Sequence, residues 1–576
     1  MKDLERSIEA ALRDFGVPGL GVSVIANHDV VLSRGFGVRA LGSPDRVDEE
    51  TRFAIGSISK SFTATAIAML VDEGKLAWDA RVTEYLGSFA LFDPYVTREL
   101  TVRDLLVHRS GLERGDMMWY KSGYDRDEVL RRVLHLQPSW SFRTTFGYQN
   151  VMYTAAGEVI RAVSGASWDD FVTSRLLQPL GMQRSSAHIT LLDRSDNLAA
   201  SHAEIAGSVC SVPPEEGTNS NAAGSIYSSA QDMVQWLRLH LSDGCIGDHR
   251  LLTSGSMAAL HTPQMLIAYT PPWTNLFPDA TFLSYAMGWF VYSYRGHTVI
   301  THGGNIDGMS AAACIVPDLG FGVVALANLD GTALSQAVVY QALDAALGER
   351  SGVRLDEFLE GERVTKARTA FAQAEHERER IPGTTPSRPL SEYAGTYGDA
   401  FYGTATVRCD ERGLYFDFIG WTGLLEHYHL DVFSLDPDKP ILKKYSPIVR
   451  FELDDFGKPA TLTMTLLGAV RMELARKPGE VKKAALSLEE MRRLVGDYRT
   501  DAPRTRVHIE LLDGNLKATL PGTLVGMQAE YAVVTLIPTS STQLSIGGTE
   551  LTVEIEKNLA TLRIPHQQPI VLERQA

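Results

Sequence analysis

The sequence lacks the features that mark several broad classes of protein. Cysteine is scarce, with 4 residues among 576, and no two are spaced like a zinc motif or a CxxC redox pair. We therefore expect free, buried thiols and no metal site. The net charge is −15, so no basic excess is available to neutralise nucleic-acid phosphates or to hold the chain on an anionic membrane. Neither kind of partner is expected.

Long apolar runs are also missing. No stretch reaches the roughly 18 apolar residues of a membrane helix, and the opening MKDLERSIEAALRDFG is charged throughout, unlike a signal peptide. We expect a cytoplasmic protein, or one whose leader was removed before the numbering begins. The glycines of GFGVRALG are wrongly spaced for a dinucleotide-binding loop, and no cofactor is expected.

The chain is too long for one hydrophobic core, and its first part alternates helices with hairpins. A helix is predicted near the start from apolar residues at helical spacing, and GLGVSVIANHDVVLSRGFGV predicts two strands around a turn. Residues 57–73 read as a helix stopped by Gly74, and Thr101 and Asp104 have capping-box spacing. The segments GHTVITHGG and FGVVALANLD are predicted as adjacent buried strands. Together these elements indicate an α/β (α+β) sandwich of about 350 residues.

The residue pattern of the sequence changes after this region. A charged, helix-prone stretch and the loop IPGTTPSRP read as a linker, and short alternating strands follow. Gly395 and Tyr397 recur as Gly496 and Tyr498, which indicates two successive antiparallel β-barrels. We expect four parts: residues 1–350, a catalytic domain; 351–387, a helical and proline-rich linker; 388–480, the first barrel; and 488–576, the second barrel.

Ser57 and Lys60 stand in FAIGSISKSF at a spacing of three. On a helix these positions share a face, so the hydroxyl and the amine can meet. A lysine activates a serine only if burial or positive neighbours lower its pKa, and the apolar residues around the pair can supply that burial. Alone, the pattern also occurs by chance as an ordinary polar turn of a helix.

Two further patterns follow in order. Tyr148 and Asn150 lie two apart at the start of an amphipathic helix, where a phenol can relay a proton and an amide can hold a carbonyl or orient a lysine. His302 ends a predicted strand, and Gly303 and Gly304 behind it allow close approach of another backbone. Such a strand edge can offer free N–H groups to an acyl oxyanion.

The ordered set S-x-x-K, Y-x-N and H-x-G resembles the serine β-lactamase and penicillin-binding-protein superfamily, in particular its class C β-lactamase, D-aminopeptidase and esterase branch. DLLVHRSGL, AAGSIYSSAQDM, YAMGW and VVALANLD add to the resemblance, which covers roughly residues 5–350. It implies a β-lactamase-like sandwich of antiparallel sheet with flanking helices and an all-α subregion. The two barrels behind it resemble the architecture of D-stereospecific aminopeptidases.

The resemblance also implies roles for the site residues. Ser57 would be the nucleophile, Lys60 and Tyr148 would share the general-base work, and the backbone N–H groups of Ser57 and Asn305 would form the oxyanion hole. The remaining three positions would bind substrate: Asn150, His302 and Gly304. His302 stands where many relatives carry the lysine of K-T-G.

The sequence therefore predicts a metal-free serine hydrolase acting through an acyl-enzyme on amides of small peptides or amino acids, with D configuration left open. A carboxylesterase, a β-lactamase or D-Ala carboxypeptidase, and a catalytically silent binding protein remain alternatives. The expected partner is a small molecule or short peptide, and a homo-oligomer is left open. Loops such as 113–145 and 245–284 are expected to shape the pocket, and the barrels to form a lid over it.

Overall fold

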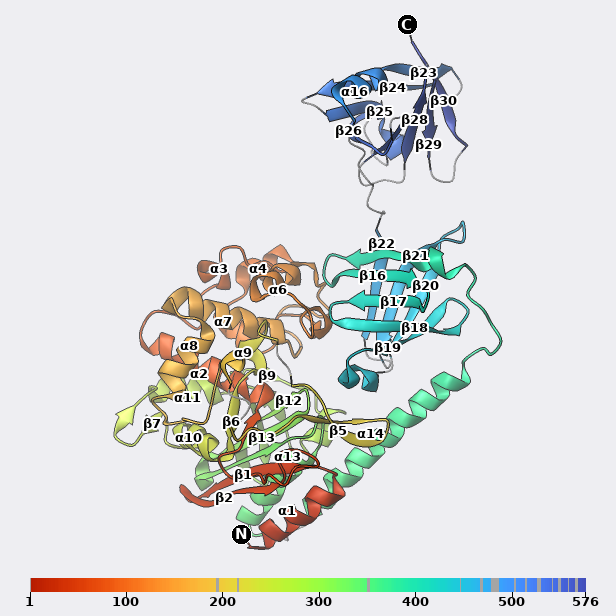
Figure 1. The fold of residues 1–576 in the computed structure, drawn as a ribbon. Coiled ribbons are helices and arrows are strands. Elements are labelled where there is room, and N and C mark those ends of the chain that lie inside the picture. The colour runs from red at the N-terminus through yellow and green to blue at the C-terminus, as the bar shows by residue number, and fades with distance from the viewer. Residues whose placement is uncertain are drawn as a thin grey trace.

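The protein is described from a computed structural model. It describes residues 2–192, 196–214, 217–349, 353–445, 447–466, 470–477, 486–501, 504–512, 515–525, 530–540, 542–546, 551–557, 559–564 and 568–575. Figure 1 shows a large mixed domain, a long outer helix and two small β domains in succession.

An antiparallel sheet forms the centre of the first domain. Its strands, from one edge to the other, are β2 (Asp29–Gly37), β1 (Gly19–Ala26), β14 (Phe321–Ala327), β13 (Met309–Val316), β12 (His297–Ile306), β11 (Phe290–Tyr294), β10 (Leu283–Tyr285) and β9 (Met265–Leu266). The predicted hairpin at the start of the chain is β1–β2, and its turn residues Asn27 and His28 have positive φ.

One expectation about this sheet is wrong. The segments GHTVITHGG and FGVVALANLD form β12 and β14, but β13 lies between them and pairs with both. The intervening sequence MSAAACIV is rich in alanine, which is a poor strand former, so its period-two pattern is weak. Hairpin connections nevertheless make each strand pair with the next one in the chain.

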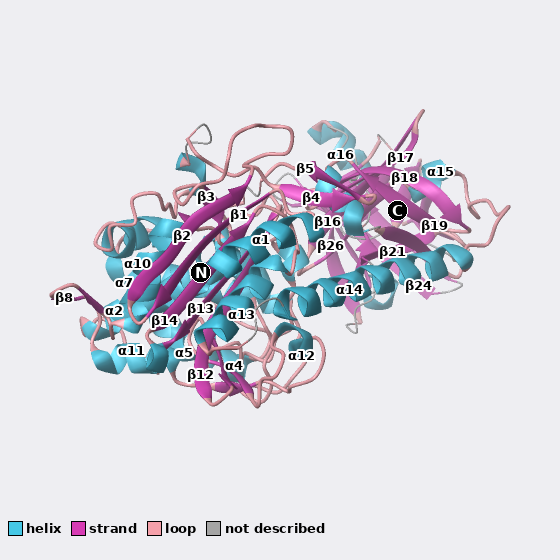
Figure 2. Ribbon diagram, turned by 90° about the horizontal axis from the view of Figure 1, so that it is seen from below, coloured by secondary structure: helices cyan, strands magenta, loops and turns pink. Residues whose placement is uncertain are grey.

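Helices cover both faces of the sheet. Helices α1 (Lys2–Asp14) and α13 (Leu334–Ala346) lie on one face, where Ile8 and Val338 join a buried apolar cluster with alternate residues of β1 and β14. Helix α10 (Ala230–Leu241) packs on the opposite face. Figure 2 shows α1 and α13 side by side over the strands. The result is the predicted sandwich of an antiparallel sheet with flanking helices.

The remaining helices of this domain gather on the α10 side of the sheet, around α2. They are α2 (Ser59–Asp72), α3 (Val82–Tyr85), α4 (Pro94–Glu99), α5 (Val102–Leu106), α6 (Arg126–Arg132), α7 (Asn150–Ser164), α8 (Trp168–Val172), α9 (Asn221–Gly224) and α11 (Ser254–His261), while α12 (Trp273–Leu276) lies beside the sheet. Every residue of α2 from Ser59 to Leu70 is buried. The predicted capping box of Thr101 and Asp104 opens α5.

Short strand pairs complete the first domain: β3 (Arg52–Ala54) with β6 (Tyr227–Ser229), β4 (His202–Ile205) with β5 (Ser208–Ser211), and β7 (Cys245–Ile246) with β8 (His249–Arg250).

The four cysteines are free, as expected. Their burial differs from the expectation, because Cys314 alone is fully buried and Cys409 is exposed.

The predicted linker contains one long helix, α14 (Val353–Arg378), which runs along the outside of the molecule (Figure 1). Its first turn is anchored by Arg354, whose Nε donates to the Asp344 carboxylate at 2.9 Å. At its far end, the Tyr428 hydroxyl of the first barrel donates to the His376 carbonyl at 2.7 Å. The helix is thus tied to both domains that it connects.

Two closed eight-stranded barrels follow. The first, entered through α15 (Leu390–Tyr393), consists of β15 (Gly395–Asp399), β16 (Gly403–Asp410), β17 (Gly413–Phe418), β18 (Trp421–His429), β19 (Val432–Pro437), β20 (Ile448–Leu453), β21 (Pro459–Leu466) and β22 (Val470–Arg476). The second, entered through α16 (Leu488–Leu494), consists of β23 (Gly496–Asp501), β24 (Arg504–Leu512), β25 (Asn515–Pro521), β26 (Tyr531–Pro538), β27 (Gln543–Ile546), β28 (Thr552–Glu556), β29 (Leu559–Arg563) and β30 (Ile570–Arg574).

The recurring tyrosine has the same role in each barrel. The buried hydroxyl of Tyr397 donates to the carbonyl of Tyr393, and that of Tyr498 donates to the carbonyl of Leu494. In each case an arginine from the last strand covers the ring, Arg476 in the first barrel and Arg574 in the second. The repeat seen in the sequence therefore fastens the first strand of each barrel to the short helix before it.

The first barrel is docked on the first domain by an apolar contact. Phe401, 4% exposed, belongs to the apolar cluster of the first domain, and a β-carbon on Gly115 would lie 2.9 Å from its ring. Nearby, the Tyr124 hydroxyl donates to the Tyr402 carbonyl at 3.1 Å.

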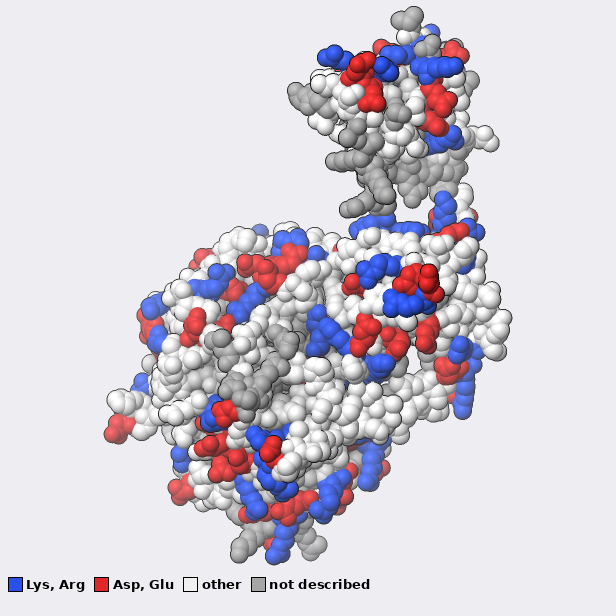
Figure 3. Space-filling view, viewed as in Figure 1, with Lys and Arg blue, Asp and Glu red and all other residues white. Residues whose placement is uncertain are grey.

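The second barrel stands apart from the first domain, beyond the first barrel (Figure 3). Acidic and basic side chains are interspersed over the face of the molecule that this figure shows. None of the described helices combines the length and apolar character needed to cross a bilayer.

Candidate active site

Ser57 lies in a tight 3₁₀ turn (η1, Gly56–Ile58) that leads directly into α2. Gly56 has φ +51°, a left-handed conformation that glycine adopts without strain. Lys60 follows in the first turn of α2 and is completely buried. Its Nζ lies 3.0 Å from the Ser57 Oγ. The predicted i, i+3 contact is therefore present, although Ser57 precedes the α-helix.

The Lys60 amine is held by two carbonyl oxygens. Its Nζ donates to Asn150 Oδ1 at 2.7 Å and to the Ala223 backbone oxygen at 2.8 Å. Burial lowers the Lys60 pKa well below its ordinary range, and the positive charge of Arg114 lowers it further, while Asp116 opposes the shift. Both oxygens can only accept, so a neutral amine uses its two N–H bonds on them. Its lone pair is then directed to the Ser57 hydroxyl.

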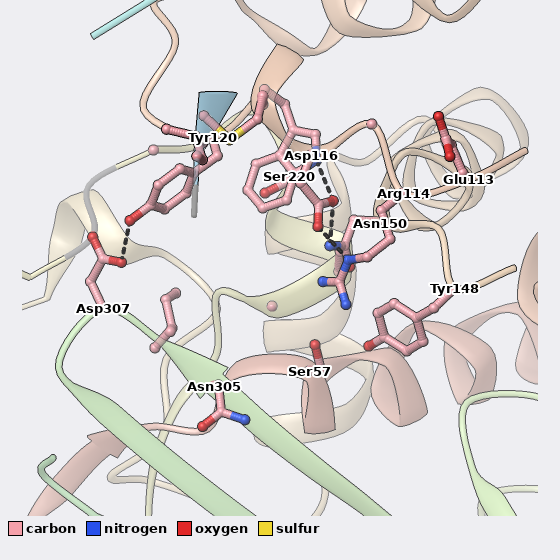
Figure 4. Close-up of a pocket in the computed structure, with 18 of the residues that line it drawn as sticks. Ser57, Glu113, Arg114, Asp116, Tyr120, Tyr148, Asn150, Ser220, Asn305 and Asp307 are labelled. Atoms are coloured by element: carbon pink, nitrogen blue, oxygen red, sulfur yellow. Dashed lines mark hydrogen bonds and ion pairs between the residues drawn. The ribbon is translucent and has the colours of Figure 1, made fainter. Parts of the chain in front are cut away.

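Tyr148 lies beside Ser57, just before α7, with its hydroxyl directed toward the Ser57 side chain, as Figure 4 shows. Burial raises its pKa to about 12, against a hydrogen bond with Ser57 that lowers it. The Lys60 Nζ lies 4.9 Å from the ring centroid, and the Arg114 guanidinium carbon lies 5.0 Å from it. The phenol is therefore protonated at neutral pH, so it can relay a proton but does not act as the base itself.

The β12 strand brings the third motif to the serine. Strand β11 pairs with β12 only as far as Thr301, so residues 302–306 are paired with β13 alone and their other edge faces the η1 turn. A β-carbon on Gly56 would lie 2.8 Å from the Asn305 backbone nitrogen. This close approach places the N–H groups of Ser57 and Asn305 on neighbouring backbones.

His302 lies beneath this edge, with 2% of its surface exposed. Its Nδ1 lies 2.6 Å from the Gly303 carbonyl oxygen, which can only accept, so Nδ1 carries the proton and Nε2 accepts from the Tyr285 hydroxyl at 3.0 Å. Burial and the neighbouring Lys60 lower the His302 pKa to about 3. The imidazole is neutral at physiological pH, unlike the lysine found at this position in K-T-G relatives.

These groups border a cavity of about 1110 Å³. Four of the residues predicted from the sequence line it, namely Ser57, Tyr148, Asn150 and Asn305, while Lys60, His302 and Gly304 lie behind its wall. The cavity is strongly aromatic, with lining rings from Trp119, Tyr120, Trp140, Phe146, Tyr148, Trp273, Tyr402 and Tyr445. Both loops that were expected to shape the pocket contribute to this wall.

The first barrel closes one side of the cavity. Tyr402 and three residues near the 3₁₀ segment η7 (Pro440–Tyr445) and β21 line it: Lys444, Tyr445 and Leu466. Lys444 forms an ion pair with Asp330 of the first domain, which raises the Lys444 pKa. The described residues of the second barrel do not line the cavity. Of the two barrels that were expected to form a lid, the first therefore borders the cavity, and its role as a lid stays a prediction.

The loop before α6 contains a charged pair that was not predicted from the sequence. Arg114 Nε donates to Asp116 Oδ2 at 2.6 Å, and Asn150 Nδ2 donates to Asp116 Oδ1 at 3.0 Å (Figure 4). The sequence signal is GLERGDMMWY, where alternating charges and two aromatic residues follow DLLVHRSGL. Nothing in that pattern reveals which neighbours the loop touches, because its conformation depends on the barrel behind it.

Comparison with known proteins gives consistent matches. The family model described as "Beta-lactamase" matches residues 4–385, and one described as "Domain of unknown function (DUF3471)" matches residues 379–483. The "Unguisins hydrolase ungD" of Aspergillus violaceofuscus (strain CBS 115571) is 29% identical over 447 residues, which cover 71% of this chain and 76% of that protein. "Penicillin-binding protein 4" of Amycolatopsis lactamdurans is 30% identical over 367 residues, covering 61% of this chain and 91% of the relative.

Among solved structures, the octameric penicillin-binding protein homologue from Pyrococcus abyssi is similar over 99% of both chains, with a TM-score of 0.54 and 18% identity. At that identity the likeness concerns the fold alone.

Proposed function

The chain belongs to the Beta-lactamase family, a family of serine hydrolases, and we propose that it hydrolyses amide bonds of small apolar peptides through an acyl-enzyme on Ser57. The observation that carries the proposal is the buried Lys60 amine, whose lowered pKa favours the neutral form and whose Nζ lies 3.0 Å from the Ser57 Oγ and within hydrogen-bond distance of two carbonyl oxygens. A lysine in this state is a base that is ready to accept the serine proton.

In the first step, the Ser57 Oγ forms a bond to the substrate carbonyl carbon and its proton passes to the Lys60 Nζ. The N–H groups of Ser57 and Asn305 donate to the resulting oxyanion. Collapse of the intermediate breaks the C–N bond. The leaving amine takes a proton from the Lys60 ammonium through the Tyr148 hydroxyl. A water molecule then attacks the acyl carbon and gives a proton to the Lys60 Nζ. Lys60 passes this proton to the Ser57 Oγ as the acyl C–O bond breaks, so the acid is released and both side chains return to their starting state.

The other predicted residues support this step from the wall. Asn150 holds Lys60 and has a second amide hydrogen free for the acyl group of the substrate. Gly304 allows the β12 edge to lie against the η1 turn. His302 remains neutral and accepts a hydrogen bond from the Tyr285 hydroxyl, and its ring lies 6.4 Å from the Tyr148 ring. In this proposal His302 shapes the wall and does not provide a cation.

The cavity supports a peptide substrate with apolar or aromatic side chains. Ligand pockets of roughly 300–1,000 Å³ enclose molecules of drug size, and about 1110 Å³ is more than a single amino-acid amide fills. Trp119, Trp140 and Trp273 offer flat apolar surfaces to such side chains.

Recognition of a free amine, as in an aminopeptidase, would fall to Glu113. The other acidic residues of the wall are each paired with a cation: Asp116 with Arg114, Asp307 with Lys121 and Asp330 with Lys444. Glu113 lines the cavity and is exposed, and within the described chain no cation is paired with it. Glu113→Gln should lower kcat/KM for free-amine substrates and leave their N-acetylated counterparts unaffected.

The decisive test of the function is a panel of p-nitroanilides and p-nitrophenyl esters of peptides, in D and L forms and with free and acetylated amines. Intact-mass measurement during turnover should show an acyl adduct on Ser57. Turnover of esters alone would favour the carboxylesterase alternative. Absence of both turnover and adduct across the panel would favour a binding protein.

A further inference from the structure

A continuous chain of hydrogen bonds links the exposed loop before α6 to the nucleophile. Arg114 Nε donates to Asp116 Oδ2 at 2.6 Å, and Asp116 Oδ1 accepts from Asn150 Nδ2 at 3.0 Å. The other end of the same carboxamide, Asn150 Oδ1, accepts from the Lys60 Nζ at 2.7 Å. Each member contacts the next directly, and Lys60, the last of the four, contacts Ser57.

The orientation of the Asn150 carboxamide decides what Lys60 can do. With Oδ1 toward the amine, Asn150 accepts an N–H bond and leaves the nitrogen lone pair to Ser57. With the carboxamide turned over, its NH₂ group would point at Nζ and compete with the Ser57 hydroxyl for that lone pair. The two ends of a carboxamide have nearly the same shape, so packing alone discriminates poorly between the two orientations.

Asp116 supplies the discrimination. An ionised carboxylate can only accept hydrogen bonds, so it can face the Nδ2 end of Asn150 and not the Oδ1 end. The carboxylate is itself held by two donors, Arg114 Nε and Trp119 Nε1, the latter at 3.0 Å. Its loop begins at Gly115, whose positive φ turns the chain into the 3₁₀ segment η2 (Asp116–Met118).

We propose that Asp116 is a positioning residue for the general base: it fixes the Asn150 carboxamide with Oδ1 toward Lys60, and Arg114 holds the Asp116 carboxylate in place. The proposal rests on the proposed function, because it assigns Lys60 the role of base. Neither Asp116 nor Arg114 exchanges a proton with the substrate in this scheme. Both act on Ser57 through Asn150 and Lys60.

The charges of Asp116 and Arg114 should affect the pH dependence of kcat/KM, which a purely structural role would leave unchanged. The titratable or charged side chains that face Lys60 are Tyr148, Tyr153, His108, His302, Arg114 and Asp116. Of these, Asp116 favours the protonated amine and Arg114 disfavours it. Removing the Asp116 charge should move the acid limb of the kcat/KM profile to lower pH, and removing the Arg114 charge should move it to higher pH.

The experiment compares Asp116→Asn, Asp116→Glu and Arg114→Gln in the full chain, using a p-nitroanilide substrate and a fluorophosphonate probe. Asp116→Asn should lower kcat at the pH optimum at least about tenfold, the scale of one hydrogen bond to a charged group, with little change in KM. Its acid limb should move to lower pH. Arg114→Gln should move the limb to higher pH, and Asp116→Glu should leave it in place and recover part of kcat.

Asp45 offers a matched control. It is an exposed carboxylate that does not line the cavity, and it pairs with Arg39 at an N···O distance of 3.2 Å. Asp45→Asn should change neither kcat nor the acid limb. Two results would overturn the proposal. One is an unchanged kcat in Asp116→Asn, and the other is an acid limb of the kcat/KM profile that moves in the same direction in Asp116→Asn and Arg114→Gln. If Asp116→Asn does not fold, an acid limb in Arg114→Gln that does not move to higher pH, or one in Asp116→Glu that does not stay in place, would overturn it.

Failure of the proposed function would look different. In that case the unmodified chain would not be labelled at Ser57 by the fluorophosphonate. Labelling of the unmodified chain together with an equal labelling rate in Asp116→Asn would reject the positioning role alone.

Discussion

Gly304 on β12 packs directly against the backbone carbonyl of Ile55, and the contact leaves no room for a side chain. A β-carbon on Gly304 would lie 1.9 Å from the Ile55 oxygen and 3.0 Å from the Ser57 nitrogen. This contact joins the strand edge to the turn that carries Ser57, the proposed nucleophile. The two backbones must meet here for the N–H groups of Ser57 and Asn305 to face one point.

Gly304→Ala should therefore damage the oxyanion hole more than the fold. The added methyl group would push β12 away from the η1 turn and separate the N–H groups of Ser57 and Asn305. Loss of one such donor lowers kcat by about 10²–10³-fold. Steady-state kinetics would check this expectation, with Gly303→Ala as the matched control, since a β-carbon there would meet only the Ala311 oxygen at an ordinary 3.6 Å.

Ser57→Ala should abolish covalent labelling by a fluorophosphonate or a penicillin-type acylator. The variant removes the atom that forms the acyl bond, so no intermediate can accumulate. Intact-mass measurement would check the result. Unchanged turnover in this variant would reject the assignment of Ser57 as nucleophile and return the chain to a binding role.

Lys60→Ala and Tyr148→Phe should each lower the acylation rate by at least about a hundredfold, the usual scale for loss of general acid–base catalysis. The double variant should be little worse than the worse single variant, because both side chains serve one proton-transfer step. Single-turnover kinetics with an active ester would measure this. Full multiplicative loss would mean that the two act independently.

The pH dependence of kcat/KM should show an acid limb set by Lys60. Since burial depresses its pKa, the amine is neutral above that depressed value and loses activity as the pH falls through it. Tyr148, whose pKa is raised to about 12, should contribute no titration below that value. Lys60→Ala should remove the acid limb, whereas Tyr148→Phe should retain it at lower overall rate.

The sequence was sufficient for the parts of the site that local geometry determines. The S-x-x-K pair needs only the helical spacing of Ser57 and Lys60, and the repeat at Gly395 and Gly496 identified both barrels. The placement of Arg114 and Asp116 could not be predicted, because their loop is held by tertiary contacts with the barrel and with Asn150. Strand β13 was missed for a similar reason: its alanines are held in the sheet by pairing with β12 and β14 rather than by intrinsic preference.

The first barrel supplies one wall of the cavity. Tyr445 lines the cavity from this barrel, and Lys444 beside it is paired with Asp330, so we expect this wall to contact the substrate. Tyr445→Ala should open the cavity and raise kcat/KM for longer or N-acetylated peptides relative to short free-amine ones. Labelling of Ser57 by a small probe should stay the same, since the substitution leaves Ser57, Lys60 and Tyr148 in place.

A chain limited to residues 1–480 provides the control for that experiment. It keeps the first barrel, whose Phe401 is buried against the first domain, and removes the second barrel, whose described residues do not line the cavity. Its preference between free-amine and N-acetylated peptides should equal that of the full chain. If Tyr445→Ala leaves this preference unchanged while the shortened chain alters it, the second barrel, and not the first, controls substrate access.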